Sequence, residues 1–176
     1  MKFPAQVFMG VTDLKSMTIY NGAQIQDLDS AFEITDSVQF ACIVKDDDAL
    51  VTMSKATVSG CGVYQMVNDN KVQRLVTTFR VKWFAVTRMS KKPVHIRDDQ
   101  ICAESGGKGV GAGDSGGPIK VKVAGKWTQI GLTSFGVGVY PLTIKQHLIP
   151  AVFTRVSKFC SFLEISTYNE FNKESF

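Results

Sequence analysis

The chain has 176 residues, of which 44% are hydrophobic and 20% are charged, as is usual for one folded domain or two small lobes. The formal net charge is +4, with basic and acidic residues interspersed, so the charge predicts no nucleic-acid partner. No stretch is apolar over the ~18 residues of a membrane span, and we expect no membrane helix.

The first segment, Met1–Gly10, begins like a signal peptide, but its apolar part is short and is interrupted by Pro4 and Gln6. We therefore predict a strand there and no signal peptide in this chain. Farther along, short segments rich in β-branched and aromatic residues alternate with turn signals. The predicted strands are Ala5–Met9, Ala56–Ser59, Val72–Val76, Phe79–Val86, Ile119–Val123, Trp127–Phe135 and Ala151–Val156.

Short strands at regular spacing predict an all-β fold, either an antiparallel barrel or a sandwich. Only one segment, Val156–Ile165, is predicted to be a helix. Its residues Val156, Phe159, Cys160 and Leu163 lie on one face of such a helix.

The four cysteines are widely spaced and include no Cys-x-x-Cys pair; they are Cys42, Cys61, Cys102 and Cys160. Neither histidine lies near a cysteine at the spacing of zinc ligands, so we expect no metal site and no cofactor. An even number of cysteines permits disulfides without requiring them.

A glycine-rich run, Gly106–Gly117, leads into the hexapeptide Gly113-Asp114-Ser115-Gly116-Gly117-Pro118. Glycine is common in tight turns, so the run alone is compatible with an ordinary turn. Here a serine stands between an aspartate and two glycines, where a tightly folded backbone presents its hydroxyl beside N–H groups. Such N–H groups stabilise the oxyanion of acyl-transfer reactions. The hexapeptide resembles the active-serine motif of the trypsin and chymotrypsin family.

Four further segments resemble the same family. Ile101-Cys102-Ala103 lies thirteen positions before the serine, counted from the cysteine, as the Ile-Cys-Ala segment does in the family. Ala56–Gly62 is similar to its Val-Ser-Gly-Trp-Gly strand, and Gly125–Gly136 to the strand that ends in Ser-Trp-Gly. Pro150–Ser157 is similar to its Pro-Gly-Val-Tyr-Thr-Arg-Val strand. The resemblance covers about residues 49–166.

The resemblance implies a trypsin-like antiparallel β-barrel with a C-terminal helix over residues 49–166. Residues 1–48 would be a partial first barrel and linker, and residues 167–176 a tail. The implied activity is that of a serine endopeptidase, which forms an acyl-enzyme at Ser115, with the N–H groups of Gly113 and Ser115 as the oxyanion hole. Protein or peptide substrates, protease inhibitors, secretion and a monomeric state are expected on the same ground.

The same resemblance assigns a specificity pocket to Gly109, Val110, Ser134, Phe135, Gly136 and Ala151. The position six before the serine is aspartate in trypsin-like members of the family and is Gly109 here. We therefore expect an uncharged, open pocket that favours apolar or aromatic side chains over Lys and Arg.

The first fifty residues resemble the family more loosely. Asp29–Ile34 is similar to the segment whose aspartate orients the catalytic histidine, which makes Asp29 the candidate triad aspartate. Asp27 is its nearest competitor, and a surface or capping role is the alternative for Asp29. Thirteen positions separate Asp29 from Cys42 (42 − 29), whereas the family has about twenty, so part of the first barrel is expected to be deleted.

The catalytic histidine of the family precedes that aspartate, but the histidines of this chain, His95 and His147, both follow it. We expect both to be surface or loop residues, and the chain as written to be a truncated, inactive protease. A non-catalytic homologue that binds proteins through its cleft is the alternative. The family's Ile-Val-Gly-Gly activation site is also absent, so we expect Asp114 to lack its usual ammonium partner.

The cysteines are interpreted through the same resemblance. It implies a disulfide between Cys42 in the linker and Cys160 in the C-terminal helix, with Cys61 and Cys102 left paired or free. Both partners of another family disulfide are replaced together, by Ala56 and Val121.

Overall fold

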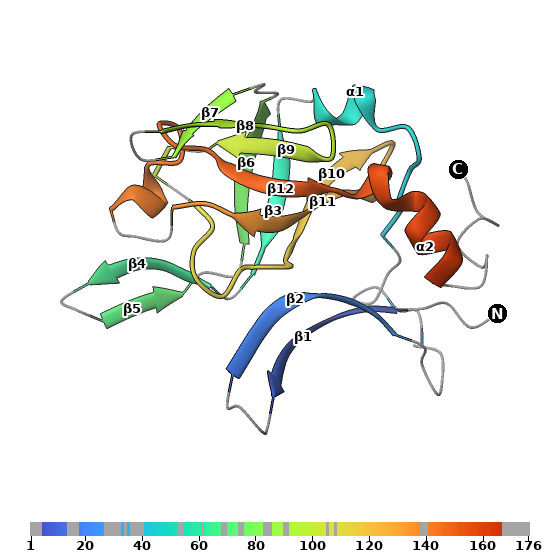
Figure 1. Cartoon of the computed structure of the whole chain (residues 1–176), viewed down its shortest axis with the longest axis horizontal. Coiled ribbons are helices and arrows are strands. Elements are labelled where there is room, and N and C mark those ends of the chain that lie inside the picture. Colours follow the sequence, from blue (N-terminus) through green and yellow to red (C-terminus); the bar gives the residue numbers. More distant parts are fainter. Residues whose placement is uncertain are drawn as a thin grey trace.

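The computed structural model describes residues 5–13, 18–26, 33, 35, 41–52, 55–60, 62–67, 70–73, 76–82, 86–89, 92–104, 106, 107, 109–137 and 141–166. Antiparallel strands curl into a barrel, and a short helix follows the last strand (Figure 1). The predicted all-β barrel with a C-terminal helix is therefore confirmed. The division into 1–48, 49–166 and 167–176 stays a prediction.

The barrel closes in the strand order β10-β11-β12-β9-β6-β3, and every neighbouring pair is antiparallel. Closure satisfies the backbone hydrogen-bonding groups that an open sheet leaves at its edges. The strands are β3 (Ala56–Ser59), β6 (Val76–Lys82), β9 (Gln100–Glu104), β10 (Pro118–Val123), β11 (Lys126–Phe135) and β12 (Ala151–Arg155).

The core of the barrel is formed by alternate residues of its strands. In β10, Ile119 and Val121 are buried, whereas Pro118 before them and Lys120 between them are partly exposed. Such alternation follows from the period of two in strand side chains and places one face of the strand in the core. Phe153 of β12 is the largest fully buried side chain and packs in the same apolar cluster.

Three further hairpins pair only within themselves among the described strands. They are β1 (Ala5–Asp13) with β2 (Thr18–Gln26), β4 (Val63–Val67) with β5 (Asn70–Gln73), and β7 (Val86–Met89) with β8 (Lys92–His95). The predicted strands Val72–Val76 and Phe79–Val86 are wrong in their bounds, because each begins in one strand and ends in the next. Residues 72–86 contain no Gly, Pro, Asn or Asp, so no turn residue marked where one strand ends and the next begins.

The helices are short. They are α1 (Asp48–Val51), the 3-10 turns η1 (Leu142–Ile144) and η2 (Val156–Phe159), and α2 (Cys160–Ser166). The predicted helix over Val156–Ile165 is present, but its first turn is η2 rather than α-helical. No helix in the described ranges is long and apolar enough to cross a membrane.

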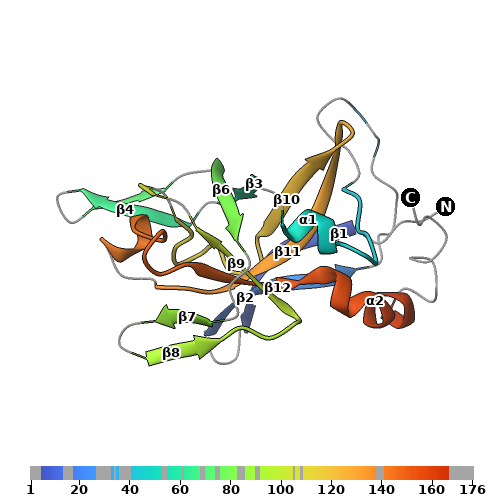
Figure 2. The same cartoon turned by 90° about the horizontal axis from the view of Figure 1, so that it is seen from above.

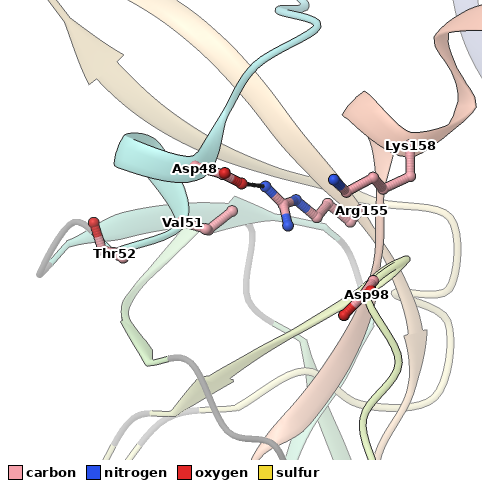
Figure 3. Close-up of a pocket in the computed structure, with 6 residues that line it drawn as sticks. All are labelled: Asp48, Val51, Thr52, Asp98, Arg155 and Lys158. Carbon is pink, nitrogen blue, oxygen red and sulfur yellow. Dashed lines mark hydrogen bonds and ion pairs between the residues drawn. The ribbon is translucent and has the colours of Figure 1, made fainter.

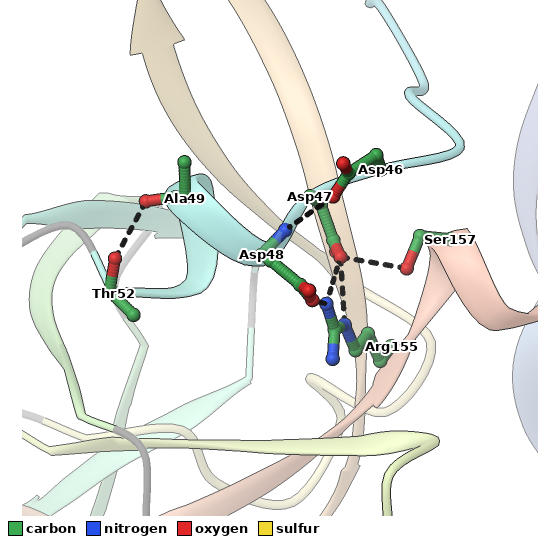
Figure 4. A network of polar contacts seen from close by, with 7 residues as sticks. All are labelled: Asp46, Asp47, Asp48, Ala49, Thr52, Arg155 and Ser157. Carbon is green, nitrogen blue, oxygen red and sulfur yellow. Dashed lines mark hydrogen bonds and ion pairs between the residues drawn. The ribbon is translucent and has the colours of Figure 1, made fainter.

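The segment before α1 is tied to the barrel at two places. At the first, the N–H of Cys42 donates to the carbonyl of Trp127, and the N–H of Gln129 donates to the carbonyl of Cys42, each at 2.8 Å. At the second, Arg155 Nε and the hydroxyl of Ser157 both donate to Asp47 Oδ1 at 2.8 Å (Figure 4). The segment thereby joins β11 to the end of β12.

The ion pair at the second place is buried. The side chains of Arg155 and Asp47 are 4% and 1% exposed, whereas that of Asp48, which also contacts Arg155, is 80% exposed. Burial alone would lower the pKa of Arg155, but hydrogen bonds to Asp47 and Asp48 outweigh it and raise that pKa. Removing one partner of such a pair leaves an uncompensated buried charge.

Within the described ranges Cys42, Cys102 and Cys160 are free thiols, so the structure does not show the expected Cys42–Cys160 disulfide. Cys102 lies fully buried in β9. Burial raises the pKa of its thiol to about 12, so this cysteine is chemically unreactive at neutral pH. Cys61 lies outside the described residues.

Candidate active site

The serine motif forms a tight turn between the loop at Gly111 and the start of β10. Gly113 and Gly116 have φ values of +98° and +79°, a region that side chains other than glycine rarely adopt. The N–H of Asp114 donates to the carbonyl of Gly111 at 3.1 Å, and that of Gly117 donates to the carbonyl of Asp114 at 2.9 Å. The glycines thus permit two successive reversals of the chain around Ser115.

The turn is pinned to β11 through one residue, Thr133. The N–H of Gly116 donates to the carbonyl of Thr133 at 2.8 Å, and the N–H and hydroxyl of Thr133 donate to the carbonyl of Gly117 at 2.8 and 3.0 Å. Because β11 is a strand of the closed barrel, these bonds hold the serine turn against a rigid support.

Asp114 is buried and has two backbone partners. The N–H of Gly62 donates to its Oδ1 at 2.7 Å, and the N–H of Gly111 donates to its Oδ2 at 2.9 Å. A Cβ atom on Gly60 or Gly62 would lie 2.2 or 2.3 Å from atoms of the Asp114 carboxylate. The glycines of this loop therefore make room for the carboxylate. The partners of Asp114 in the described part of the chain are thus backbone N–H groups, and the expected lack of an ammonium partner stays a prediction.

Ser115 lines a cavity of about 180 Å³ beside the turn. The cavity lies between the 110–115 segment and the end of β11, and none of the described residues that line it is charged. Its lining residues are Val110, Gly111, Ala112, Ser115, Thr133, Ser134, Phe135, Gly136 and Val137. Val110 and the stretch Ser134–Gly136, which the resemblance assigned to a specificity pocket, thus lie around Ser115 in the structure.

Gly109 and Ala151 do not line this cavity. A Cβ atom on Gly109 would lie 1.6 Å from the carbonyl oxygen of Thr143, so this glycine is buried against the η1 segment. Ala151 is fully buried, and its Cβ lies 3.5 Å from where a Cβ of Gly136 would be. Both residues lie behind the wall of the cavity rather than on it.

Two N–H groups next to the serine are unused. Among the described residues, neither the N–H of Gly113 nor that of Ser115 donates a hydrogen bond. Gly113 is exposed and Ser115 is partly buried, so both groups are close to solvent beside the cavity. Unpaired backbone donors beside a serine are what an oxyanion hole requires.

Gln146 is a residue that the sequence analysis missed. It is fully buried, and its side-chain amide bonds to both backbone groups of Val110: Nε2 donates to the carbonyl at 2.8 Å, and Oε1 accepts from the N–H at 3.3 Å. Gln146 thereby holds the wall residue Val110 from behind. A glutamine in a loop between lysine and histidine carries no sequence signal of this contact.

The other candidate residues lie apart from the serine. Asp29 and Asp27 fall outside the described residues. His95, at the end of β8, is exposed, as is His147, which lies near Gly106, and no described histidine is hydrogen-bonded to Ser115. Among the described residues, no group of His, Cys, Asp and Glu is arranged to bind a metal ion.

A larger cavity of about 380 Å³ lies elsewhere, between α1 and the end of β12 (Figure 3). Its polar side chains are largely engaged: Figure 3 shows the Arg155 guanidinium directed at Asp48, and Asp47 binds it from the buried side. It contains no nucleophilic serine or cysteine among its lining residues Asp48, Val51, Thr52, Asp98, Arg155 and Lys158. We therefore take the smaller cavity beside Ser115 as the candidate active site.

One family model, that of trypsin, matches residues 2–163 of the chain. The match covers the barrel, the glycine turn and the residues around the cavity. The chain belongs to the trypsin family. It is a trypsin-like serine protease domain, and the match includes the N-terminal hairpin as well as the closed barrel.

Curated relatives of this trypsin-like domain are serine proteases. The chain is 30% identical to chymotrypsin-C of Mus musculus and 27% identical to chymotrypsin-C of Bos taurus, each over 161 residues, with 84% of this chain and 55% of the relative covered. It is 39% identical to tryptase of Mus musculus over 71 residues, or 40% of this chain and 24% of the relative. The chain thus spans about half the length of the chymotrypsin-C relatives.

Proposed function

We propose that the chain carries the nucleophile, the oxyanion hole and the substrate pocket of a serine endopeptidase. The observation that supports this most directly is the position of Ser115, which lines the uncharged cavity of about 180 Å³ beside two unpaired N–H groups. In this proposal the Ser115 hydroxyl attacks the carbonyl of a peptide bond. The N–H groups of Gly113 and Ser115 then hold the oxyanion before an acyl-enzyme forms.

The chemistry needs a base for the serine proton. In a serine protease, loss of the base costs on the order of 10⁶ in turnover. No described histidine is bonded to Ser115, and Asp29 has a role here only if an imidazole stands between it and the serine. We therefore propose that these 176 residues, taken alone, hydrolyse peptides very slowly and contribute the serine half of the active site.

The cavity supports a preference for apolar side chains. No charged residue lines it, so a Lys or Arg side chain would have no carboxylate to meet. Its volume, about 180 Å³, is close to that of an engineered cavity of about 150 Å³ that binds benzene. We propose protein substrates cleaved after an apolar residue no larger than a single ring, such as Leu or Phe, in a secreted setting, with inhibitors that occupy the same cavity.

A second candidate function is protein binding without catalysis. The feature that favours it is the lack of a bonded histidine at Ser115 in the described part of the chain, although the cavity is formed. In that case the cavity would still bind an apolar side chain of a partner protein.

The two candidates differ in the reactivity of Ser115, which labelling of the chain with a fluorophosphonate measures. With the chain alone we expect slow labelling, because no base activates the hydroxyl. Added imidazole supplies a base in solution, and it should increase the labelling rate in proportion to its concentration until saturation. The labelled residue is identified as Ser115 by mass spectrometry, and Ser115→Ala is the control that should not react.

Labelling that stays at the level of Ser115→Ala with imidazole present would contradict the endopeptidase proposal and favour the binding module. Rapid labelling without imidazole would instead contradict the proposed slow reaction of the chain alone. The same assay with phosphonates that carry a Leu, Phe or Arg side chain tests specificity. We expect Leu and Phe to react faster than Arg.

A further inference from the structure

The hairpin of β10 and β11 carries two lysines and a tryptophan on its outer face. Val121 points into the barrel, whereas Lys120 and Lys122 lie on the opposite face of β10. Lys122 is paired directly with Trp127 across the hairpin, and Lys120 is its diagonal neighbour. In Figure 2 this hairpin extends to one side of the barrel, and near its turn the carbonyl of Trp127 accepts a hydrogen bond from the N–H of Cys42. We call Lys120, Lys122 and Trp127 the basic hairpin face.

The tryptophan ring holds the two ammonium groups in place. Lys120 Nζ lies 5.4 Å and Lys122 Nζ 5.6 Å from the centroid of the Trp127 ring. Both distances are within the range of cation–π attraction. Trp127 is nevertheless 39% exposed. Two charges are thus positioned before any partner arrives, which reduces the entropy lost on binding.

Among the residues that the structure describes, no carboxylate neutralises this face. Neither Lys120 nor Lys122 forms an ion pair with a described residue; the described ion pairs involve Lys45, Arg97 and Arg155. The sequence explains this, because no Asp or Glu occurs between Asp114 and Glu164. The chain has 16 acidic residues in all, so their absence from this long stretch leaves the hairpin with an uncompensated positive field.

We infer that the basic hairpin face binds an extended acidic segment of a partner protein. Alternate side chains of a strand repeat at about 7 Å, which sets the separation of Lys120 and Lys122. An extended peptide with Asp or Glu at every second position has the same repeat, so its carboxylates meet both lysines at once. The exposed part of Trp127 then contacts an apolar group of the same segment.

A peptide segment fits better than a membrane surface. Trp127 lies under two ammonium groups and is not free to insert its ring among lipid chains. An extended peptide also has the same spacing between alternate side chains as β10. It can therefore match the two lysines in spacing as well as in charge.

The face is distinct from the Ser115 cavity. β11 runs from Lys126 to Phe135, and Trp127 lies seven residues before Ser134, a separation of about 23 Å along an extended strand. A protein bound at both places would gain affinity through the linkage of the two contacts. The inference itself does not require Ser115 to react, so it is independent of the proposed function.

The test measures binding of the whole chain to a fluorescent peptide of alternating Glu and Thr. Fluorescence anisotropy reports the binding at low and at high salt. We expect binding that weakens as salt is added, because exposed charges are screened. The variant Lys120→Ser/Lys122→Ser should bind about tenfold more weakly at low salt, consistent with the loss of two exposed ion pairs. Trp127→Leu should weaken binding by a smaller factor, since it removes the positioning of the lysines and the contact of the ring but keeps both charges.

The matched control is Lys145→Ser/Lys158→Ser, which removes the same charge from exposed lysines elsewhere in the acid-free stretch and should keep the original affinity. All four lysines are on the surface, and circular dichroism checks that each variant folds. Equal weakening by both double variants would overturn the inference. So would tighter binding of heparin, of anionic lipid vesicles or of single-stranded DNA to this face than of the acidic peptide.

Discussion

The closed barrel and the N-terminal hairpin differ in how their strand edges are paired. Each barrel strand has a neighbour on both sides, in the ring β10-β11-β12-β9-β6-β3. β1 and β2 are longer than most of these strands, at nine residues each, but they pair only with each other among the described strands (Figure 1). Strand length alone therefore does not decide which part of the molecule is rigid.

The difference explains where the candidate site lies. The serine turn bonds to Thr133 of β11, the Asp114 carboxylate bonds to the loop after β3, and Gln146 holds Val110 from behind. All of these supports belong to the closed barrel or to loops between its strands. A precisely placed nucleophile needs such rigid elements around it, and a two-stranded hairpin is only marginally stable by itself.

The largest expected effect comes from breaking the buried ion pair that ties the segment before α1 to the closed barrel. Asp47→Ala should lower the free energy of unfolding by about 3–5 kcal/mol, because Arg155 would keep a buried charge without its buried partner. Urea unfolding followed by tryptophan fluorescence measures this. Asp46→Ala is the control, since Asp46 is exposed in the same segment, and it should change little. Equal stability of the two variants would contradict the structural role of the pair.

An effect of intermediate size is expected in amide hydrogen exchange, which compares the local stability of the hairpin with that of the barrel. We expect amides in β1 and β2 to exchange at least about 100-fold faster than those of β9, β11 and β12, because local opening of a two-stranded sheet requires less free energy than opening of a closed barrel. Mass spectrometry of peptic fragments gives the rates. Protection of the hairpin equal to that of β12 would show that it is part of the same cooperative unit.

The smallest effect is the pH dependence of stability that comes from Asp48, the exposed carboxylate that pairs with Arg155. The hydrogen bond from Arg155, with its positive charge, lowers the pKa of Asp48 below its ordinary value of 3.8. The stabilisation by this carboxylate is thus present above pH 3.8 and is lost as the pH falls through the lowered pKa. Asp48→Asn should reduce the melting temperature slightly at pH 6 and not at pH 2. A difference that grows toward low pH would contradict the assignment.

The sequence predicted the barrel strands well where apolar and polar residues alternate between clear turns. β3 has the predicted bounds, and β10, β11 and β12 each differ from them by one residue. The prediction of strand bounds failed over residues 72–86, where no turn residue separates one strand from the next. It also missed β2, β4, β8 and β9 as strands, although it matched the Ile-Cys-Ala segment within β9.

For the site, local sequence resemblance pointed to Ser115 and to residues that line the same cavity, but Gly109 and Ala151 do not line it, and the roles of all these residues stay predictions. It could not identify the partners of Asp114, since Gly62 is 52 residues away, or those of Gln146, which is 36 residues from Val110. The expected disulfide between Cys42 and Cys160 rested on resemblance alone. In the structure Cys42 instead uses its backbone to pair with β11, and its thiol is free.

By itself the sequence indicated the family, through a serine in a glycine turn, and the kind of fold, through short alternating strands. Only the tertiary structure decided which groups support that serine and how Lys120 and Lys122 share one tryptophan ring. The physical reason is the same in each case. Turn geometry and strand alternation depend on neighbours in the chain, whereas burial, carboxylate partners and charge compensation depend on which distant strands meet when the barrel closes.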